Sequence, residues 1–360
     1  MLELRDVKKV MGAETHIGGV SLELQHGSLN VLLGPTLSGK TTLMRMMAGL
    51  ERPTSGSIWF DGKDVTGIAP QKRNVAMVHQ QFINYPAMSV YDNIASPLRL
   101  AKVDSKVIDR RVREAADLMK LSPMLDRLPH NLSGGQQQRT ALARAIVKDA
   151  ALVLLDEPLA NLDYKLREEL RAELPRIFAK AGSIFVYATT EPSEALLLGG
   201  NTVTLSQGRA TQFGPTIEVF RRPKDLITAQ TFADPPLNTI TLEKRRSSFL
   251  LGDGAALPVP EDALHASDGS YIIGFQPHHL SLLPQIPEAV GVKARITVTE
   301  ITGSESFVHL AFGRHSWVML TAGIHHLDAD QEIEVFIDPR RLMVFDKHEN
   351  AVQRPPRQAA

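Results

Sequence analysis

Three short apolar runs without a helical period occur along the chain. They are Leu29–Leu33, residues 151–157 and residues 184–188. Such runs are typical of strands that are buried on both faces of a parallel sheet. Residues 166–180, between the second run and the third, have the composition of a crossover helix despite Pro175. The pattern therefore predicts an α/β core.

Alternating apolar and polar positions surround the first run. Residues 2–33 alternate in this way up to a turn at Gly27, which predicts antiparallel strands that lead into the buried strand. Residues 57–60, followed by Asp61-Gly62, have the turn chemistry of a hairpin. Residues 75–79 predict a further strand. An antiparallel β subdomain is therefore expected beside the parallel sheet.

Between residues 88 and 148 the apolar positions change to a helical period. One face of the central helix carries Ile108, Val112, Ala115, Ala116 and Met119. Because Pro123 cannot continue a helix, we expect this helix to end there. The segment is interpreted as a helical subdomain inserted into the α/β core.

Adjacent prolines at 235 and 236 predict a domain boundary, because proline neither extends a helix nor pairs in a central strand. Short alternating segments follow at residues 291–301, 306–312 and 333–337. They indicate a small all-β barrel over residues 236–352. Residues 353–360, with two further prolines, are expected to be a disordered tail.

Composition narrows the class of partner. Lysine plus arginine and aspartate plus glutamate number 40 each, so the formal net charge is zero, which argues against nucleic acid as a partner. The absence of cysteine excludes disulfides, thiolate metal ligands and cysteine nucleophiles. No signal peptide or run of 18 apolar residues is found. Any membrane contact is therefore expected to go through a partner.

The first buried strand leads directly into a phosphate-binding motif. Residues 34–41 fit G-x-x-x-x-G-K-[ST] and precede a helical stretch that ends at Gly49. Backbone N–H groups and a helix N-terminus would face the phosphates, Lys40 would add a positive charge, and the Thr41 hydroxyl would bind Mg²⁺. The candidate ATP-binding residues here are Gly34, Pro35, Thr36, Leu37, Ser38, Gly39, Lys40, Thr41 and Thr42.

A second motif narrows the family. Residues 132–139 read L-S-G-G-Q-Q-Q-R, which resembles the signature of ABC-type ATPases. The resemblance covers residues 1–235 and implies a P-loop ABC ATPase fold, with ATP and Mg²⁺ as cofactors. In that family the signature acts across a dimer on the ATP of the opposite subunit. It adds four candidate ATP-binding residues, Ser133, Gly134, Gly135 and Gln136.

The resemblance also implies roles for single residues. Lys40 and Thr41 resemble the phosphate and Mg²⁺ ligands. Gln80 resembles the glutamine that senses Mg²⁺ and the attacking water, and Asp156 resembles the carboxylate near Mg²⁺. Glu157 resembles the catalytic base that orients the water. Residues 160–163 resemble the loop that links the two sites of the dimer.

Three positions depart from the family pattern. Thr190 stands where a histidine contacts the γ-phosphate, Met11 where an aromatic ring stacks on adenine, and Leu37 where the loop has glycine. Loss of stacking costs about 0.5–1.5 kcal/mol in affinity. Loss of a donor to the reacting phosphate costs about 3–4 kcal/mol, or a hundred- to a thousandfold in rate. Thr190 is therefore the most consequential departure.

All three departures lie in the half-site that uses the chain's own phosphate loop, while the signature is intact. This distribution favours a heterodimer of two ATPases, with one impaired site and one competent site. The alternative is a homodimer in which Glu157 suffices and Thr190 is tolerated.

The C-terminal part resembles the accessory barrel (TOBE domain, OB-like) of carbohydrate-importer ATPases. Two phrases carry this likeness, at residues 274–280 and 337–346, although Gln276 and His278 replace the arginine and glutamate of the first. Histidine pairs at 278–279 and 325–326 raise a metal hypothesis. Neighbours in a β region point to opposite faces, which disfavours that hypothesis.

The resemblance implies several partners and a place in the cell. They are integral-membrane permease subunits, a second ATPase subunit (a paralogue or a second copy) and, indirectly, a periplasmic solute-binding protein. The implied location is the cytoplasmic face of the inner membrane. Phe82, Tyr85, Pro86 and Met88 would line a groove for a short permease helix, or alternatively pack inside the helical subdomain.

The sequence thus predicts the ATPase subunit of an importer for a sugar, polyol or glycerol-type solute. Two alternatives remain open at this point. One is a soluble ABC ATPase outside transport, and the other is an ATP-binding regulatory subunit with little turnover of its own.

Overall fold

The computed structural model describes residues 1–81, 83–160, 162–180, 182–252 and 255–352. The chain forms two compact units, Met1–Arg221 and Arg222–Ala360. The prolines at 235 and 236 thus lie inside the second unit, and the helix before them, α8 (Leu226–Thr231), packs against Leu237 and Phe345 of that unit. The predicted tail, residues 353–360, lies outside the described residues.

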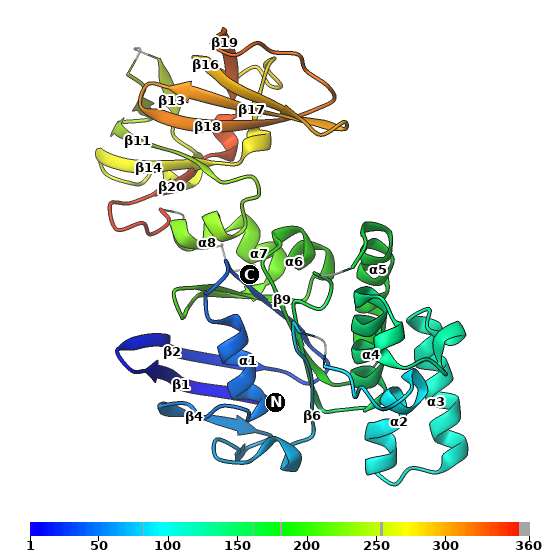
Figure 1. Ribbon diagram of the computed structural model, residues 1–360. Coiled ribbons are helices and arrows are strands. Elements are labelled where there is room, and N and C mark those ends of the chain that lie inside the picture. The colour runs from blue at the N-terminus through cyan, green and yellow to red at the C-terminus, as the bar shows by residue number, and fades with distance from the viewer. Residues whose placement is uncertain (82, 161, 181, 253–254, 353–360) are drawn as a thin grey trace. The chain divides into compact units, whose positions relative to one another are not determined.

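A six-stranded sheet forms the centre of the first unit (Figure 1). Its order is β10 (Arg209–Pro215), β9 (Asn201–Ser206), β3 (Leu29–Leu33), β8 (Ile184–Thr189), β7 (Leu152–Asp156) and β6 (Val75–Val78). All neighbours are parallel except β9 and β10. The three apolar runs are β3, β7 and β8, and the residues of β7 and β8 are buried throughout. The predicted parallel core is confirmed.

The predicted antiparallel layer is also confirmed. It has the order β2 (Glu14–Leu24), β1 (Leu2–Met11), β4 (Ser55–Phe60) and β5 (Lys63–Asp64). The β4–β5 pair is the hairpin expected at Asp61-Gly62. One continuous core joins both sheets to helix α1 (Lys40–Ala48), whose buried methionines pack against them.

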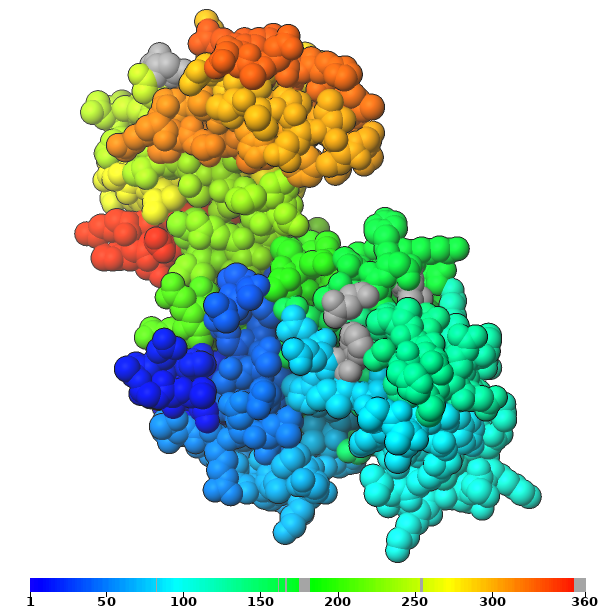
Figure 2. All heavy atoms as spheres, in the orientation of Figure 1, coloured from blue at the N-terminus to red at the C-terminus, as the bar shows by residue number. Residues whose placement is uncertain are grey.

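Six further helices belong to this unit among the described residues. They are α2 (Val90–Leu100), α3 (Ser105–Leu118), α4 (Gly134–Val147), α5 (Tyr164–Lys180), α6 (Pro192–Leu198) and α7 (Thr216–Arg221), with short 3-10 turns η1 (Pro70–Lys72), η2 (Ser122–Met124) and η3 (Pro129–Asn131). The helical subdomain, α2 to α4, is confirmed. In Figure 2 its surface (cyan to green) is separate from that of β1 and β2 (dark blue). Helix α3 ends at Leu118, before the proline expected to stop it.

The second unit contains two five-stranded antiparallel sheets. One has the order β13 (Ala256–Pro258), β12 (Ser248–Leu250), β11 (Asn238–Arg245), β14 (Gly269–Phe275) and β20 (Met343–Phe345). The other has the order β15 (Leu280–Ser281), β19 (Glu332–Ile337), β16 (Val290–Ile301), β17 (Glu305–Phe312) and β18 (His315–Ala322). Three 3-10 turns accompany them, η4 (Glu261–Ala263), η5 (Pro277–His279) and η6 (Pro339–Arg341).

A buried indole packs between these two sheets. Trp317 is fully buried, stacks on Phe312 at 4.6 Å between ring centroids and meets Phe275 edge-on at 5.2 Å. Its Nε1 donates to the carbonyl of Thr239 at 3.2 Å. Because Phe275 and Thr239 belong to one sheet and Phe312 and Trp317 to the other, the sheets close around one core. The predicted small barrel is confirmed.

Across the described ranges, no helix has both the length and the apolar character needed to cross a membrane.

The adjacent histidines of the second unit differ from expectation. His278 and His279 lie in the 3-10 turn η5 and not in a strand, so their rings do not point to opposite faces but pack edge to face at 4.3 Å. Burial lowers the pKa of His279 to about 4, and His278 and Arg341 add to that effect while Asp338 opposes it. The Nδ1 atom of His279 is buried without a hydrogen-bond partner among the described residues. The neutral ring is therefore the form that the fold accommodates.

This burial predicts that the second unit loses stability in mild acid. The unfolded chain protonates His279 near pH 6.5, whereas the folded chain does so only near pH 4. The free energy of unfolding should therefore fall as the pH drops from 6.5 to 4. Urea unfolding at several pH values would measure this slope. His279→Asn should flatten it more than His278→Asn, and an unchanged slope in His279→Asn would contradict the assignment.

Candidate nucleotide-binding site

The phosphate-binding motif lies in the turn between β3 and α1. Gly39 is the N-cap of α1 with φ 101°, a left-handed conformation that glycine adopts without strain. A Cβ there would lie 2.7 Å from Ile17 Cδ1 and 3.1 Å from the carbonyl oxygen of His16. The turn therefore needs glycine for close packing as well as for its dihedral angles, and it leaves the first N–H groups of α1 without helical acceptors.

Lys40 is the first residue of α1 and is only 5% exposed. Its Nζ donates to the carbonyl oxygens of Gly34 at 2.8 Å and Pro35 at 3.0 Å. It also lies 3.9 Å from Glu157 Oε1. Burial lowers the Lys40 pKa, while the charges of Glu157 and Asp156 oppose that shift. The ammonium group is thus held by carbonyl oxygens at the start of the motif and lies near Glu157.

Two acidic residues lie near this lysine, Asp156 as the last residue of β7 and Glu157 directly after it. Asp156 is 2% exposed, and burial raises its pKa, although a hydrogen bond with Thr41 and the charge of Lys40 oppose the shift. Burial also raises the pKa of Glu157. The unprotonated carboxylates are therefore costly here unless a cation lies close.

Gln80 reaches the same point from the end of β6. Its Nε2 donates to Glu157 Oε2 at 3.0 Å. Glu157 itself has φ 46°, an uncommon value for a residue with a side chain, and its N–H donates to the carbonyl oxygen of Ala188 at 3.0 Å. Strained backbone of this kind is frequent at functional sites. The ends of β6, β7 and β8 thus fix the position of this carboxylate.

A cavity of about 590 Å³ opens over these groups. Its lining includes Thr36, Leu37, Ser38, Gly39, Lys40, Thr41, Thr42, Gln80 and Glu157. Five further lining residues were missed by the sequence reasoning, namely Glu14, Thr15, His16, Gln207 and Gly208. They come from the start of β2 and the turn between β9 and β10, which only the tertiary fold brings to the motif.

Several predicted site residues do not line this cavity. Met11 is 53% exposed and pairs with Glu14 across the β1–β2 hairpin, so its neighbour lines the cavity while Met11 does not. Three other predicted residues contact lining residues instead. Gly34 and Pro35 accept hydrogen bonds from Lys40, and Asp156 forms a hydrogen bond with Thr41. Thr190 is exposed just beyond β8 and is not among the lining residues.

The signature residues lie at the start of α4. Ser133 is the N-cap, and its Oγ accepts from the N–H of Gln136 at 3.3 Å, while Gln136 Oε1 accepts from the N–H of Ser133 at 3.0 Å. This reciprocal capping box holds the first turn. Ser133 and Gly134 are exposed, and none of the four signature residues lines the cavity of the same chain.

The site fits a magnesium-bound nucleoside triphosphate. Ser38 Oγ is buried without a hydrogen-bond partner within the described part of the chain, and it lies in the lining beside the N-terminus of α1. A phosphate oxygen there would accept from such a hydroxyl and from backbone N–H groups. The carboxylate, hydroxyl and amide oxygens of Asp156, Thr41 and Gln80 are the donor types that Mg²⁺ prefers.

Comparison with known proteins agrees with this geometry. Residues 17–160 match the family model described as ABC transporter. A trehalose/maltose import ATP-binding protein of Thermococcus litoralis is 37% identical, and the alignment covers 96% of this chain and 97% of the relative. The chain belongs to the ABC transporter family. The resemblance drawn from the signature is thereby confirmed.

Other members of the ABC transporter family are similarly close. An sn-glycerol-3-phosphate import ATP-binding protein of Yersinia enterocolitica is 35% identical over 96% of this chain and 97% of its own length. Its counterpart from Bordetella avium is 38% identical over 88% of each chain. A bacterial ABC transporter cassette solved as a dimer matches with a TM-score of 0.56 at 26% identity, covering 60% of this chain and 99% of that chain. The ABC transporter family binds ATP, and its ATP-binding proteins are transport ATPases.

Leu37 is a strained residue within the motif. It has φ 66°, and its side chain is 95% exposed, so no packing compensates for the unfavourable backbone. A left-handed conformation costs a residue with a Cβ about 1–2 kcal/mol. Glycine at this position would remove that cost, less about 0.5–1 kcal/mol for its greater freedom in the unfolded chain.

We therefore predict that Leu37→Gly raises the free energy of unfolding by up to about 1.5 kcal/mol. Leu37→Ala is the matched control, because alanine keeps the Cβ that strains the turn. It should give no gain, since the exposed leucine side chain contributes no packing. Urea unfolding of the nucleotide-free chain measures both variants, and equal stability of the two would contradict the strain.

Proposed function

We propose that this chain is the ATP-binding and hydrolysing subunit of an importer for a sugar, polyol or glycerol-type solute. The observation that carries the proposal is the contact between Gln80 and Glu157 within 3.9 Å of Lys40, in a cavity bounded by the phosphate-binding motif. The relatives named trehalose/maltose and sn-glycerol-3-phosphate import ATP-binding proteins support the importer class. They give less support to a soluble ATPase outside transport.

In this proposal the N–H groups at the start of α1 and the Ser38 hydroxyl bind the phosphates of ATP. Lys40 exchanges the carbonyl oxygens of Gly34 and Pro35 for phosphate oxygens. Thr41, Gln80 and Asp156 would hold Mg²⁺, directly or through water, and the ion when bound supplies neutralisation of the phosphate charge. Glu157 accepts a hydrogen bond from, and thereby orients, the water that attacks in line. Thr190 would donate at most one hydrogen bond to the γ-phosphate.

The signature supports a two-chain site. Ser133, Gly134, Gly135 and Gln136 do not line the chain's own cavity, and Ser133 and Gly134 are exposed at a helix N-terminus where they can meet a second subunit. We propose that they complete the ATP site of a paralogous ATPase subunit. In that arrangement this chain's own site, with Thr190, Leu37 and Met11, turns over slowly. A homodimer remains the alternative that the experiment below distinguishes.

The segment after Gln80 is the proposed contact with the permease. Tyr85 is 46% exposed and Met88 39%, and Pro86 is exposed as well. This exposure argues against the alternative that these residues pack inside the helical subdomain. Phe82 lies outside the described residues. The backbone of Tyr85 is fixed by the buried Asn93 of α2, which accepts from its N–H at 2.8 Å and donates to its carbonyl at 3.1 Å. An exposed apolar segment on a fixed backbone suits a short amphipathic helix.

The remaining parts of the proposal follow from the importer class. The chain would act at the cytoplasmic face of the inner membrane beside permease subunits, and a periplasmic solute-binding protein would contribute indirectly. A regulatory subunit that holds ATP with little turnover is the second candidate function, favoured by Thr190. Trapping of radiolabelled nucleotide separates the two, because a regulatory site retains ATP and an active site releases ADP.

The proposed role of Thr190 predicts how fast this chain hydrolyses ATP. The isolated chain should hydrolyse ATP slowly, a paralogous ATPase subunit should raise the rate, and Thr190→His should raise the isolated chain's kcat on the order of a hundredfold. A donor to the reacting phosphate is regained, so KM should change little. Phosphate release is the measurement.

Glu157→Gln is the control for this experiment, because it should abolish turnover in both backgrounds while ATP still binds. Ordinary hydrolysis by the isolated chain, with no gain from Thr190→His, would contradict the heterodimer and favour the homodimer.

A further prediction concerns Tyr85. Removal of one aromatic anchor typically costs about 2 kcal/mol, so Tyr85→Ala should weaken assembly with the permease about thirtyfold without reducing ATP binding. Co-purification and transport-coupled hydrolysis would measure this. Leu100→Ala, at an 83% exposed leucine at the end of α2, is the matched control and should have no effect. Loss of ATP binding in Tyr85→Ala would count against docking.

A further inference from the structure

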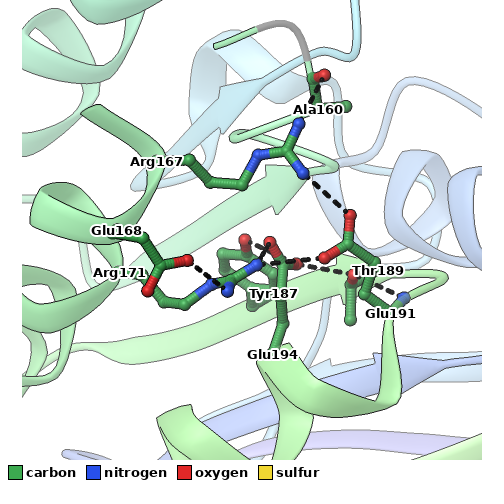
Figure 3. A network of polar contacts seen from close by, with 8 residues as sticks. All are labelled: Ala160, Arg167, Glu168, Arg171, Tyr187, Thr189, Glu191 and Glu194. Carbon is green, nitrogen blue, oxygen red and sulfur yellow. Dashed lines mark hydrogen bonds and ion pairs between the residues drawn. The ribbon is translucent and has the colours of Figure 1, made fainter. Parts of the chain in front are cut away.

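A polar network is buried at the end of β8, immediately before position 190 (Figure 3). Glu194, 4% exposed on α6, accepts from the Tyr187 hydroxyl at 2.9 Å and from the Thr189 hydroxyl at 2.6 Å. Thr189 Oγ1 in turn accepts from the N–H of Glu191 at 3.0 Å. The backbone on both sides of Thr190 is thus tied to α6.

Two arginines of α5 join this network from the other side. Arg171 donates to Glu191 Oε2 at 3.0 Å and to Glu194 Oε1 at 3.3 Å. Arg167, one helical turn earlier, donates to Glu191 Oε1 at 3.3 Å. Both oxygens of the Glu191 carboxylate are therefore held, each by a different arginine.

Arg167 also reaches the loop that follows Glu157. Its Nη2 donates to the carbonyl oxygen of Ala160 at 3.4 Å. That loop begins with a tight turn, in which the N–H of Ala160 donates to the carbonyl oxygen of Glu157 at 3.3 Å. A continuous path of polar contacts therefore runs from Glu157 through Ala160 and Arg167 to Glu191 and Thr189, the two residues that flank Thr190, entirely within one chain.

Stability alone is a poor explanation for this arrangement. The Arg171–Glu194 pair is buried, whereas the two pairs with Glu191 are partly exposed to water, and neither kind of ion pair contributes much net stability. The Nε atoms of both Arg167 and Arg171 are buried without hydrogen-bond partners among the residues that the structure describes, which lowers stability further. What the network provides is geometry, since several directional contacts converge on the two residues that flank position 190.

We propose that Arg167 and Arg171 are positioning residues that hold the backbone at Thr190 in register with the loop after Glu157. The inference rests on the proposed ATPase function for its kinetic consequence. It also accounts for a feature of this chain. The residues that hold the backbone at position 190 are present, although that position carries a threonine where the family pattern has the histidine that contacts the γ-phosphate. Thr190→His would then place the new imidazole on a framework that is already built.

The first test is hydrogen exchange on the full chain, which needs no ATPase activity. In Arg167→Met, peptides containing Ala160 and Glu191 should both exchange about tenfold faster than in the unmodified chain, because one side chain links them. Arg171→Met should accelerate the peptide containing Glu191 more than the one containing Ala160. Unchanged exchange at Glu191 in both variants would overturn the proposal.

Glu168→Gln is the matched control. Glu168 accepts from Arg171 Nη1 at 2.7 Å, on the side away from Glu191, and is 43% exposed. Its loss removes an ion pair from the same arginine without touching the path to Thr190, so exchange at Glu191 should stay within twofold. Acceleration as large as in Arg171→Met would mean that any lost charge loosens the region, and would also overturn the proposal.

The second test combines kinetics with the Thr190→His variant. Adding Arg167→Met to Thr190→His should remove most of the gain in kcat and leave the KM for ATP within about twofold, whereas Arg167→Lys, which keeps the charge, should restore part of the gain. A full gain in the double variant would contradict the proposal. If Thr190→His is inactive throughout, the proposed function fails, and the exchange experiment alone still decides the positioning role.

Discussion

The buried ammonium group of Lys40 is the constraint on which the first unit depends. A charge that is 5% exposed must be met by acceptors, and the chain supplies the carbonyl oxygens of Gly34 and Pro35 together with the carboxylate of Glu157. These groups come from the end of β3, the turn after it and the end of β7. Strands β3 and β7 belong to one parallel sheet with β8 between them, and this arrangement is what allows the lysine to be buried. The same geometry leaves a cavity in which phosphates can replace the carbonyl oxygens.

The neighbouring carboxylates carry the complementary cost. Burial raises the pKa of both Asp156 and Glu157, so their charged forms depend on Lys40 and on any cation held beside Thr41 and Gln80. A magnesium–triphosphate complex would supply an anion for Lys40 and a cation for the two carboxylates. The strained φ of Glu157 fits this requirement for a ligand, and so does the Ser38 hydroxyl, which has no hydrogen-bond partner among the described residues. These features lower the stability of the fold, and binding of such a ligand would stabilise them.

Departures from the family pattern leave this framework unchanged. Thr190 follows a strand whose end is tied by Thr189, Glu191 and Glu194, and Leu37 occupies a turn that keeps its left-handed backbone. In the proposed site, the side chains that would face a nucleotide differ from the family pattern, while contacts hold the backbone beside them. A site can in this way lose catalytic power and still keep the shape that dimer formation requires, which is the physical basis for proposing an asymmetric pair.

Local pattern determined most of the architecture. Buried strands appear as apolar runs, and glycine with lysine and threonine after the first run marks the phosphate turn, because these signals depend on near neighbours in the chain. The histidine pair at 278–279 was misplaced because a 3-10 turn and a strand differ little in local pattern. Glu14, His16 and Gln207 could not be predicted as lining residues, since they reach the cavity only when β2 and the β9–β10 turn pack beside β3. The path from Glu157 to Glu191 was also decided by tertiary structure, because Arg167 reaches both Ala160 and Glu191 only when α5 packs beside α6.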